Sequence, residues 1–123
     1  MAHSNTQSET IVTALHYLFT HSGKRSVAHC LDLDLVTSGD NMEQAEDRLN
    51  AVVVAQIGLC YGAGNFGQLR VKAPSEYWEA LSDAKELDRK QLEVEVPPVV
   101  LPVKRSFVHL SVYRHETALA AAA

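Results

Sequence analysis

Apolar and polar positions alternate over about the first third of the chain, a pattern that predicts the strands of a β-sheet. Residues 10–20 are rich in β-branched and aromatic types, as strands usually are. A turn at residues 21–24 leads into a second alternating run at residues 26–31, so the two runs predict a hairpin. Residues 27–37 are either one long strand or two short strands bent at residues 32–34, where the aspartates favour the bend.

A helix signal follows these strands. Asp40 can serve as the N-cap, and Glu43 then occupies the third helical position, as in a capping box. Apolar residues recur at helical spacing after this cap: Met42, Ala45, Leu49, Val52, Val53 and Ile57. Residues 52–55 are apolar nearly all round, which predicts that the second half of the helix is the more deeply buried. Gly58 and the glycines after it are expected to end the helix and open a loop.

The second half of the chain carries shorter signals. Pro74 precedes a predicted helix over residues 75–87, in which Ser75 is the expected N-cap. Its expected packing residues are Tyr77, Trp78 and Leu81. Residues 88–98 are charged and end in two prolines, which predicts an extended linker. The alternating run at residues 107–114, FVHLSVYR, predicts a final strand.

Together these elements predict an α+β fold in the order β-β-β-α-α-β. The expected sheet is mainly antiparallel, with three to four strands and one main helix packed on one face. A length of 123 residues suits a single domain with its own core. We place that domain at residues 10–115, after a disordered polar lead-in at residues 1–9 and before a low-complexity tail at residues 116–123.

Composition narrows the class of protein. A net charge of -4 argues against a nonspecific binder of nucleic acid or of membrane surfaces, which needs concentrated Lys and Arg. Two cysteines make neither a disulfide framework nor a paired zinc motif, which favours a reduced, cytoplasmic setting. The N-terminal residues lack an apolar signal-peptide core, and no apolar run reaches the length of a membrane span. No cofactor is expected.

Two motifs could carry chemistry, and each has a structural alternative. Residues 62–67 match G-x-G-x-x-G, but a dinucleotide-binding loop follows a strand and precedes a helix, whereas this one follows a helix. We therefore interpret it as a helix end and a loop. Asp32 and Asp34 would share one face of a strand, where paired carboxylates can hold a divalent metal ion. The alternative is that they form a turn or a solvated face.

Histidines and aromatic residues supply further candidates. His16, His29 and His109 each lie on a predicted strand, and they would cluster if those strands were neighbours. A single histidine on a strand is more often a hydrogen-bonded structural residue. Tyr77 and Trp78 open a predicted helix, where such a pair either docks the helix on the core or anchors a partner.

Residues 26–49, SVAHCLDLDLVTSGDNMEQAEDRL, resemble the HicB antitoxin-like family. The residues that carry the resemblance are Val27, Ala28, Cys30, Leu33, Val36, Thr37, Gly39, Asp40, Glu43, Ala45 and Leu49. The resemblance implies a partial RNase H-like β-β-β-α-β fold without the nuclease's catalytic acids. Typical members neutralise a small ribonuclease toxin by covering it. Two departures are clear: residues 31–34 replace the family's Pro-rich bend, and no C-terminal DNA-binding motif follows, so direct DNA binding is not expected.

The leading interpretation is a non-enzymatic HicB-like domain that binds a protein partner, which the resemblance suggests is a small toxin. The candidate partner-binding residues are Tyr77, Trp78, Phe107 and His109. We also expect a homodimer, because the late strand could pair with the main sheet or cross to a second subunit. Two alternatives stay open: a metal-dependent nuclease or hydrolase that uses Asp32 and Asp34, and a small-ligand-binding module that uses the loop at residues 62–68 and Trp78.

Overall fold

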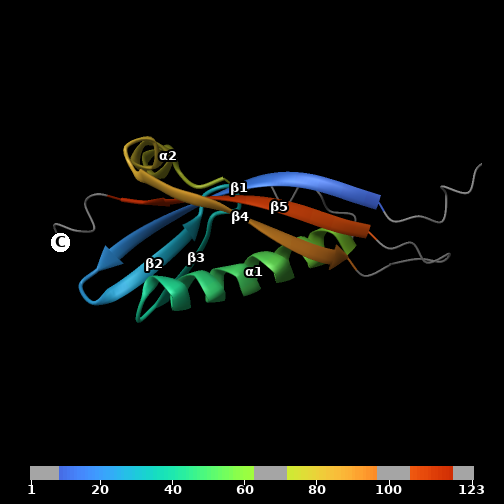
Figure 1. Ribbon diagram of the computed structural model, residues 1–123, viewed down its shortest axis with the longest axis horizontal. Helices are drawn as coiled ribbons and strands as arrows, with labels where there is room; N and C mark the ends of the chain where they lie inside the picture. The colour runs from blue at the N-terminus through green and yellow to red at the C-terminus, as the bar shows by residue number, and fades with distance from the viewer. Residues whose placement is uncertain (1–8, 63–71, 97–105, 118–123) are drawn as a thin grey trace, which may run out of the picture.

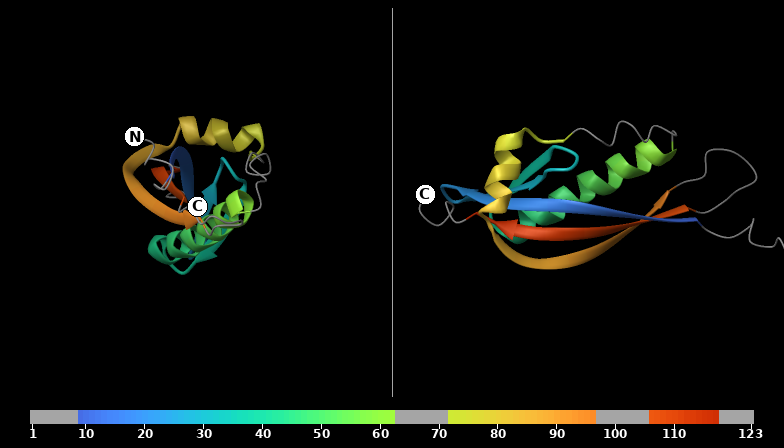
Figure 2. Two further views of the ribbon diagram at one scale, coloured as in Figure 1. Left: turned by 90° about the vertical axis from the view of Figure 1, so that its right-hand side faces the viewer. Right: turned by 90° about the horizontal axis from the view of Figure 1, so that it is seen from above.

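A five-stranded sheet with one helix on each face forms the fold of this chain (Figure 1). The computed structural model describes residues 9–62, 72–96 and 106–117. The elements in chain order are β1 (Glu9–Ser22), β2 (Arg25–Cys30), β3 (Leu35–Gly39), α1 (Met42–Gly62), α2 (Ser75–Ser82), β4 (Lys85–Val96) and β5 (Ser106–Glu116). Figure 2 shows α1 and α2 on opposite sides of the sheet. Neither helix in this part of the chain is long and apolar enough to cross a membrane.

The strand order across the sheet is β3-β2-β1-β5-β4. Strand β1 pairs antiparallel with β2, β2 with β3, and β4 with β5, whereas β1 and β5 run parallel at the centre. The predicted α+β class is confirmed. The predicted sheet of three to four strands is corrected to a mixed sheet of five strands, because the first and the last long strands meet in parallel and a further strand joins the edge.

That further strand is β4, which the sequence did not predict. The expected helix at residues 75–87 ends at Ser82, and most of the expected linker at residues 88–98 belongs to β4. Strand β4 lies at the edge of the sheet, where charged side chains can face water. From its second half Leu92 and Val94 pack against the core, so the apolar alternation in the described part of the strand is short.

The bend between β2 and β3 resolves the alternative that the sequence left open. Strand β2 ends at Cys30 and β3 begins at Leu35, so the chain forms two short strands rather than one long strand. Asp34 closes the turn with a φ of 52°, a left-handed conformation that Asp tolerates better than most residues. This conformation directs the chain from the turn into β3.

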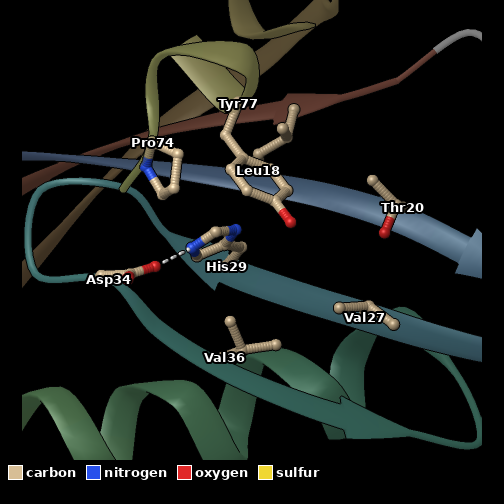
Figure 3. A pocket seen from close by; sticks show the side chains of 8 residues that line it. All are labelled: Leu18, Thr20, Val27, His29, Asp34, Val36, Pro74 and Tyr77. Atoms are coloured by element: carbon tan, nitrogen blue, oxygen red, sulfur yellow. Dashed lines mark hydrogen bonds and ion pairs between the residues drawn. The ribbon is translucent and has the colours of Figure 1, made fainter. Parts of the chain in front are cut away.

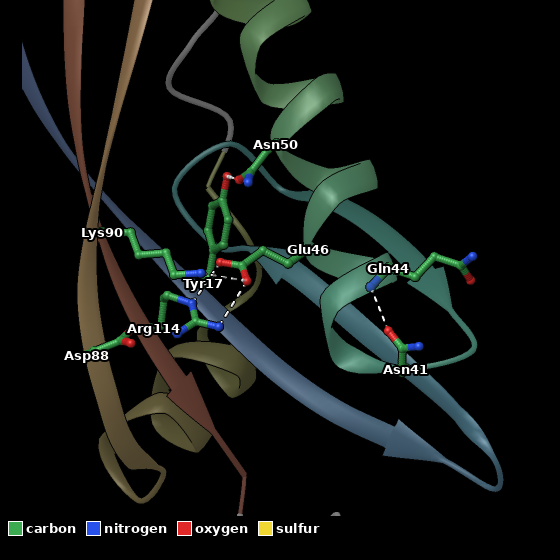
Figure 4. Close-up of polar contacts among 8 residues, drawn as sticks. All are labelled: Tyr17, Asn41, Gln44, Glu46, Asn50, Asp88, Lys90 and Arg114. Atoms are coloured by element: carbon green, nitrogen blue, oxygen red, sulfur yellow. Dashed lines mark hydrogen bonds and ion pairs between the residues drawn. The ribbon is translucent and has the colours of Figure 1, made fainter.

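The start of α1 is capped one residue later than predicted. Asn41 Oδ1 accepts a hydrogen bond from the Gln44 backbone N–H at 2.8 Å (Figure 4), and Gln44 Oε1 accepts one from the Asp40 N–H at 2.7 Å. Asn41 and Gln44 thus take the roles expected of Asp40 and Glu43, except that the Gln44 side chain bonds the N–H of Asp40, one residue before the cap, rather than that of Asn41 itself. The helix also continues past Gly58 to Gly62. Helix α2 spans Ser75–Ser82, so the predicted N-cap is wrong: Pro74 occupies the N-cap position, Ser75 is the first helical residue, and no side chain caps the helix.

The main core lies between α1 and the sheet. Its buried members are Leu15, Tyr17, Phe19, Ala28, Cys30, Ala45, Leu49, Val53, Ile57, Val94, Leu110 and Val112. The second half of α1 is not buried all round, and Leu59 is 71% exposed, because the helix touches the sheet along one side only. On the other face a small cluster around Leu18 and Leu31 packs against Trp78 of α2.

Several sequence predictions concern residues outside the described ranges. The lead-in at residues 1–8, the glycine-rich residues 63–67 and the tail at residues 118–123 are among them. Strand β1 begins at Glu9 and β5 ends at Glu116, one residue beyond each predicted domain boundary.

Candidate functional site

The turn at residues 31–34 brings each of its two aspartates against a different histidine. Asp32 Oδ2 lies 3.0 Å from His16 Nδ1, and Asp32 also accepts a hydrogen bond from the His16 backbone N–H. Asp34 Oδ1 lies 2.8 Å from His29 Nε2. The two carboxylates that the sequence placed on one strand face are thus engaged in separate pairs.

Helix α2 places one aromatic side chain on each of these pairs. The Tyr77 ring stands edge-on to His29, with ring centroids 4.8 Å apart, and the Trp78 ring stands edge-on to His16 at 5.5 Å. Neighbouring residues on a helix point about 100° apart, so Tyr77 and Trp78 reach different sides of α2. The result is two clusters that each contain an aspartate, a histidine and an aromatic residue: Asp34–His29–Tyr77 and Asp32–His16–Trp78.

The two aromatic residues play different structural parts. Trp78 is half-buried, packs in the small cluster under α2 and donates a hydrogen bond from Nε1 to the Ala73 carbonyl at 3.2 Å. Tyr77 is 40% exposed. Trp78 therefore holds α2 against the sheet. Tyr77 is the one of these two predicted partner-binding residues that is exposed at the surface.

A cavity of about 410 Å³ opens beside Tyr77 (Figure 3). It is lined by Leu18, Thr20, Val27, His29, Asp34, Val36, Pro74 and Tyr77. Its walls are mostly apolar, and its polar groups are the His29–Asp34 pair and two hydroxyls. A cavity of this size with few polar groups has the general character of a binding site. Val36, on the edge strand β3, is 57% exposed at its rim.

A second cavity of about 490 Å³ lies on the other side of α2. Its lining includes His16, Trp78, Glu86, Tyr113 and His115. Tyr113 stacks on His16 with ring centroids 5.4 Å apart, and the Arg89 guanidinium lies 4.5 Å from the Tyr113 ring centre. The hydrogen bond to Asp32 raises the pKa of His16 above its usual 6.5, against the opposing effect of burial. His115 Nδ1 is buried without a hydrogen-bond partner in the described residues.

The predicted histidine cluster does not form, because His109 of β5 lies opposite Val12, four residues before His16 on β1. Each of the three histidines instead has its own acid. His16 pairs with Asp32, His29 pairs with Asp34, and His109 Nε2 lies 3.2 Å from Glu93 Oε2. Among residues 9–62, 72–96 and 106–117, no group of three or more His, Cys, Asp or Glu side chains is placed to hold a metal ion.

The other predicted candidates are dispersed. Phe107 belongs to β5, and its side chain lies outside the described part of the structure. His109 also lies on β5, where it is half-exposed beside β4 and apart from the lining of either cavity at α2. Cys30 and Cys60 are buried and free.

Ser26, His21 and Glu116 form a chain of hydrogen bonds that sequence reasoning missed. Ser26 Oγ lies 3.1 Å from His21 Nδ1, and His21 Nε2 lies 2.9 Å from Glu116 Oε2. The order serine, histidine, acid is that of a hydrolase triad. Ser26 is only 3% exposed, however, so its hydroxyl is out of reach of a substrate. The arrangement ties the ends of β1, β2 and β5 together.

A buried polar cluster joins α1 to the opposite edge of the sheet (Figure 4). Arg114 binds Glu46 at two points and Asp88 at a third, and Lys90 Nζ lies 3.5 Å from Glu46 Oε1. The Tyr17 hydroxyl donates to Asn50 Oδ1 at 2.8 Å nearby, and burial raises the pKa of Tyr17. Glu46 lies one helical turn after Met42, on the apolar side of α1. An acid at this position was the one signal in the sequence that could have revealed the cluster.

Scans against protein-family models, characterised proteins and solved structures found no match to this chain. The HicB-like resemblance of residues 26–49 stays a prediction.

Proposed function

We propose that this chain is a HicB-like domain that binds a basic protein partner through the surface formed by α2 and the neighbouring edge strand β3. The observation that carries the proposal is an apolar cavity flanked by Tyr77 and Val36, two of the most exposed large apolar side chains in the described residues. Exposed apolar groups that surround a concavity are typical of surfaces that bind other proteins. We refer to Val36, Pro74, Glu76, Tyr77 and Glu79 as the α2 surface.

The charge of the α2 surface selects the kind of partner. Every charged residue of α2 is an acid, and Glu76 and Glu79 are both exposed. Asp83, directly after the helix, is exposed as well. A partner with a positive surface is therefore attracted to this side of the molecule. A small basic ribonuclease toxin, the class of partner that the resemblance implies, has that property.

The chain order supports the same proposal. Three antiparallel strands are followed directly by α1, which packs on the face of the sheet opposite α2. This is the β-β-β-α part of the order that the HicB-like resemblance implies. Asp32 and Asp34 are each hydrogen-bonded to a histidine, and this favours a structural part for them over the metal-binding alternative.

Affinity capture from the native cell, followed by binding measurements with the purified captured protein, tests the proposal. We expect wild type to retain a small basic protein, and the variant Val36→Asp/Glu76→Lys to lose at least about 90% of that binding, because a charge replaces the apolar rim and the attraction is reversed. The matched control is Glu43→Lys, which reverses the charge of an exposed acid on α1, on the opposite face of the sheet. Equal binding by all three proteins, or capture of acidic proteins only, would contradict the proposal.

The proposed domain is a cytoplasmic homodimer. Strand β5 pairs with β1 and β4 of its own sheet, so a dimer would form without exchange of this strand. Val52 and Leu59, seven residues apart and so on one side of α1, leave an exposed apolar strip that suits contact with a second copy. Light scattering over a wide concentration range checks this, and a monomer throughout would rule the dimer out.

A further inference from the structure

We infer that the cavity beside α2 binds a phenol ring, and that the partner protein fills it with a tyrosine side chain. This inference rests on the proposed function for its second half, because it says which group of the partner enters the α2 surface. The first half stands on the cavity alone. The cavity of about 410 Å³ is large enough for one aromatic side chain and is walled by Leu18, Val27, Val36 and Pro74.

The direction of one hydrogen bond decides the polar chemistry of the cavity. His29 is well buried, with its side chain only 8% exposed, and its Nε2 lies 2.8 Å from Asp34 Oδ1. An ionised carboxylate only accepts hydrogen bonds, so a neutral imidazole in this pair carries its proton on Nε2. The other ring nitrogen, Nδ1, then offers a lone pair, and in Figure 3 it faces away from Asp34. A ligand that matches this atom must donate a hydrogen bond.

Two hydroxyl groups complete the polar set. Tyr77 and Thr20 both line the cavity, and in Figure 3 the Tyr77 hydroxyl points into the space between His29 and Thr20. Each hydroxyl can donate or accept a hydrogen bond. A phenol donates its proton to His29 Nδ1 and accepts from one of these hydroxyls, while its ring lies against the apolar walls. An indole can only donate, and an aliphatic side chain leaves the nitrogen without a partner.

The acid in the cavity wall excludes a carboxylate ligand. Such a ligand has no proton to give to Nδ1, and it would be repelled by Asp34. The contact of Asp34 with Nε2 leaves Nδ1 as the free nitrogen of the ring. A neutral ring with one hydroxyl is therefore the chemistry that the cavity matches best.

Titration of the full chain with p-cresol, the side-chain analogue of tyrosine, tests the site directly by NMR. We expect shifts at the backbone amides of Thr20, Val27 and Val36 and at His29 Nδ1, with Nε2 still protonated. The comparison ligand 4-methylanisole has the same ring but no proton to donate. It should bind about fivefold more weakly, the usual effect of one lost neutral hydrogen bond.

Two variants guard against indirect effects. Val36→Trp should fill the mouth of the cavity and abolish the p-cresol shifts without loss of folding, because Val36 is exposed on the edge strand. Asp47→Trp places the same side chain on the exposed side of α1 and should leave the shifts unchanged. Absence of shifts with p-cresol, or equal affinity for 4-methylanisole, would overturn the inference.

The partner half of the inference is tested separately with the captured protein. Replacement of the partner's interface tyrosine by phenylalanine should weaken binding about fivefold, and Val36→Trp should weaken it further. If p-cresol binds as expected but no basic partner is captured, the proposed function fails while the phenol site stands. If a partner binds and neither Val36→Trp nor any tyrosine substitution in it has an effect, the inference fails while the proposed function stands.

Discussion

Arg114 and Glu46 form a two-point ion pair in the interior, between β5 and α1. Arg114 Nε lies 2.7 Å from Glu46 Oε2, and Nη2 lies 2.9 Å from Oε1. A third bond joins Arg114 Nη1 to Asp88 Oδ1 on β4 at 2.6 Å. Burial alone would lower the pKa of Arg114, but the bonds from Glu46 and Asp88 raise it overall. The pair therefore links the main helix to the C-terminal hairpin through a permanently charged contact.

Removal of Arg114 should be among the most destabilising single changes in this chain. We expect Arg114→Met to lower the free energy of unfolding by about 3 kcal/mol, because Glu46 is left buried with only the half-exposed Lys90 nearby. Urea denaturation measures this. The double variant Glu46→Leu/Arg114→Met should recover much of the loss, and Asp88→Asn, at a half-exposed position, should cost less than about 1 kcal/mol. A double variant no more stable than Arg114→Met would contradict this account.

The elements that the sequence predicted correctly are those with local causes. The β1–β2 hairpin follows from alternation and a glycine turn, and α1 follows from its cap and its apolar stripe. Strand β4 was missed because what makes it a strand is its pairing with β5, which begins ten residues after β4 ends. A charged edge strand has little apolar alternation of its own. The parallel pairing of β1 with β5 likewise joins the two ends of the chain and has no local signal.

The sequence identified residues of the candidate site but not which of them contact one another. Asp32, Asp34, Tyr77 and Trp78 were all singled out, and all four belong to the two clusters at α2. The sequence paired the aspartates with each other, whereas the turn separates them and gives each a histidine from a neighbouring strand. The pairing of Asp32 with His16 depends on the register of β1 against β2, which only the folded sheet fixes.

Substitution of alanine for glycine should lower the stability of the fold at Gly39 and raise it at Gly58. At Gly39 an added Cβ would lie 2.6 Å from the backbone nitrogen of Ala45, where β3 passes closely into α1. We expect Gly39→Ala to cost about 2 kcal/mol, because neither backbone segment can move freely. At Gly58, inside α1, an added Cβ meets nothing within 4 Å. Gly58→Ala should therefore stabilise the fold by about 0.5–1 kcal/mol. Thermal and urea unfolding of both variants check this, and destabilisation by Gly58→Ala would contradict it.

The thiol of Cys30 should be inert in the folded protein. Cys30 lies in the core, and burial raises its pKa to about 12, so the reactive thiolate is scarce at neutral pH. We expect iodoacetamide at about pH 8 to label Cys30 only as fast as the chain unfolds. Mass spectrometry of the labelled peptide over a urea series measures this rate. Labelling of Cys30 in native buffer at the rate of a free thiol would show that β2 is less protected than its burial implies.

The pair formed by His16 and Asp32 should make stability depend on pH in a definite direction. The hydrogen bond to Asp32 raises the pKa of folded His16 above the usual 6.5, so its contribution is complete below that value and is lost as the pH rises through the folded pKa. We therefore expect His16→Gln to destabilise the protein more at about pH 5.5 than at about pH 8.5, as judged by urea midpoints. Asp32→Asn should remove the same pH-dependent part while keeping the imidazole between Trp78 and Tyr113. A loss of equal size at both pH values would mean that the bond to Asp32 does not favour the charged imidazole.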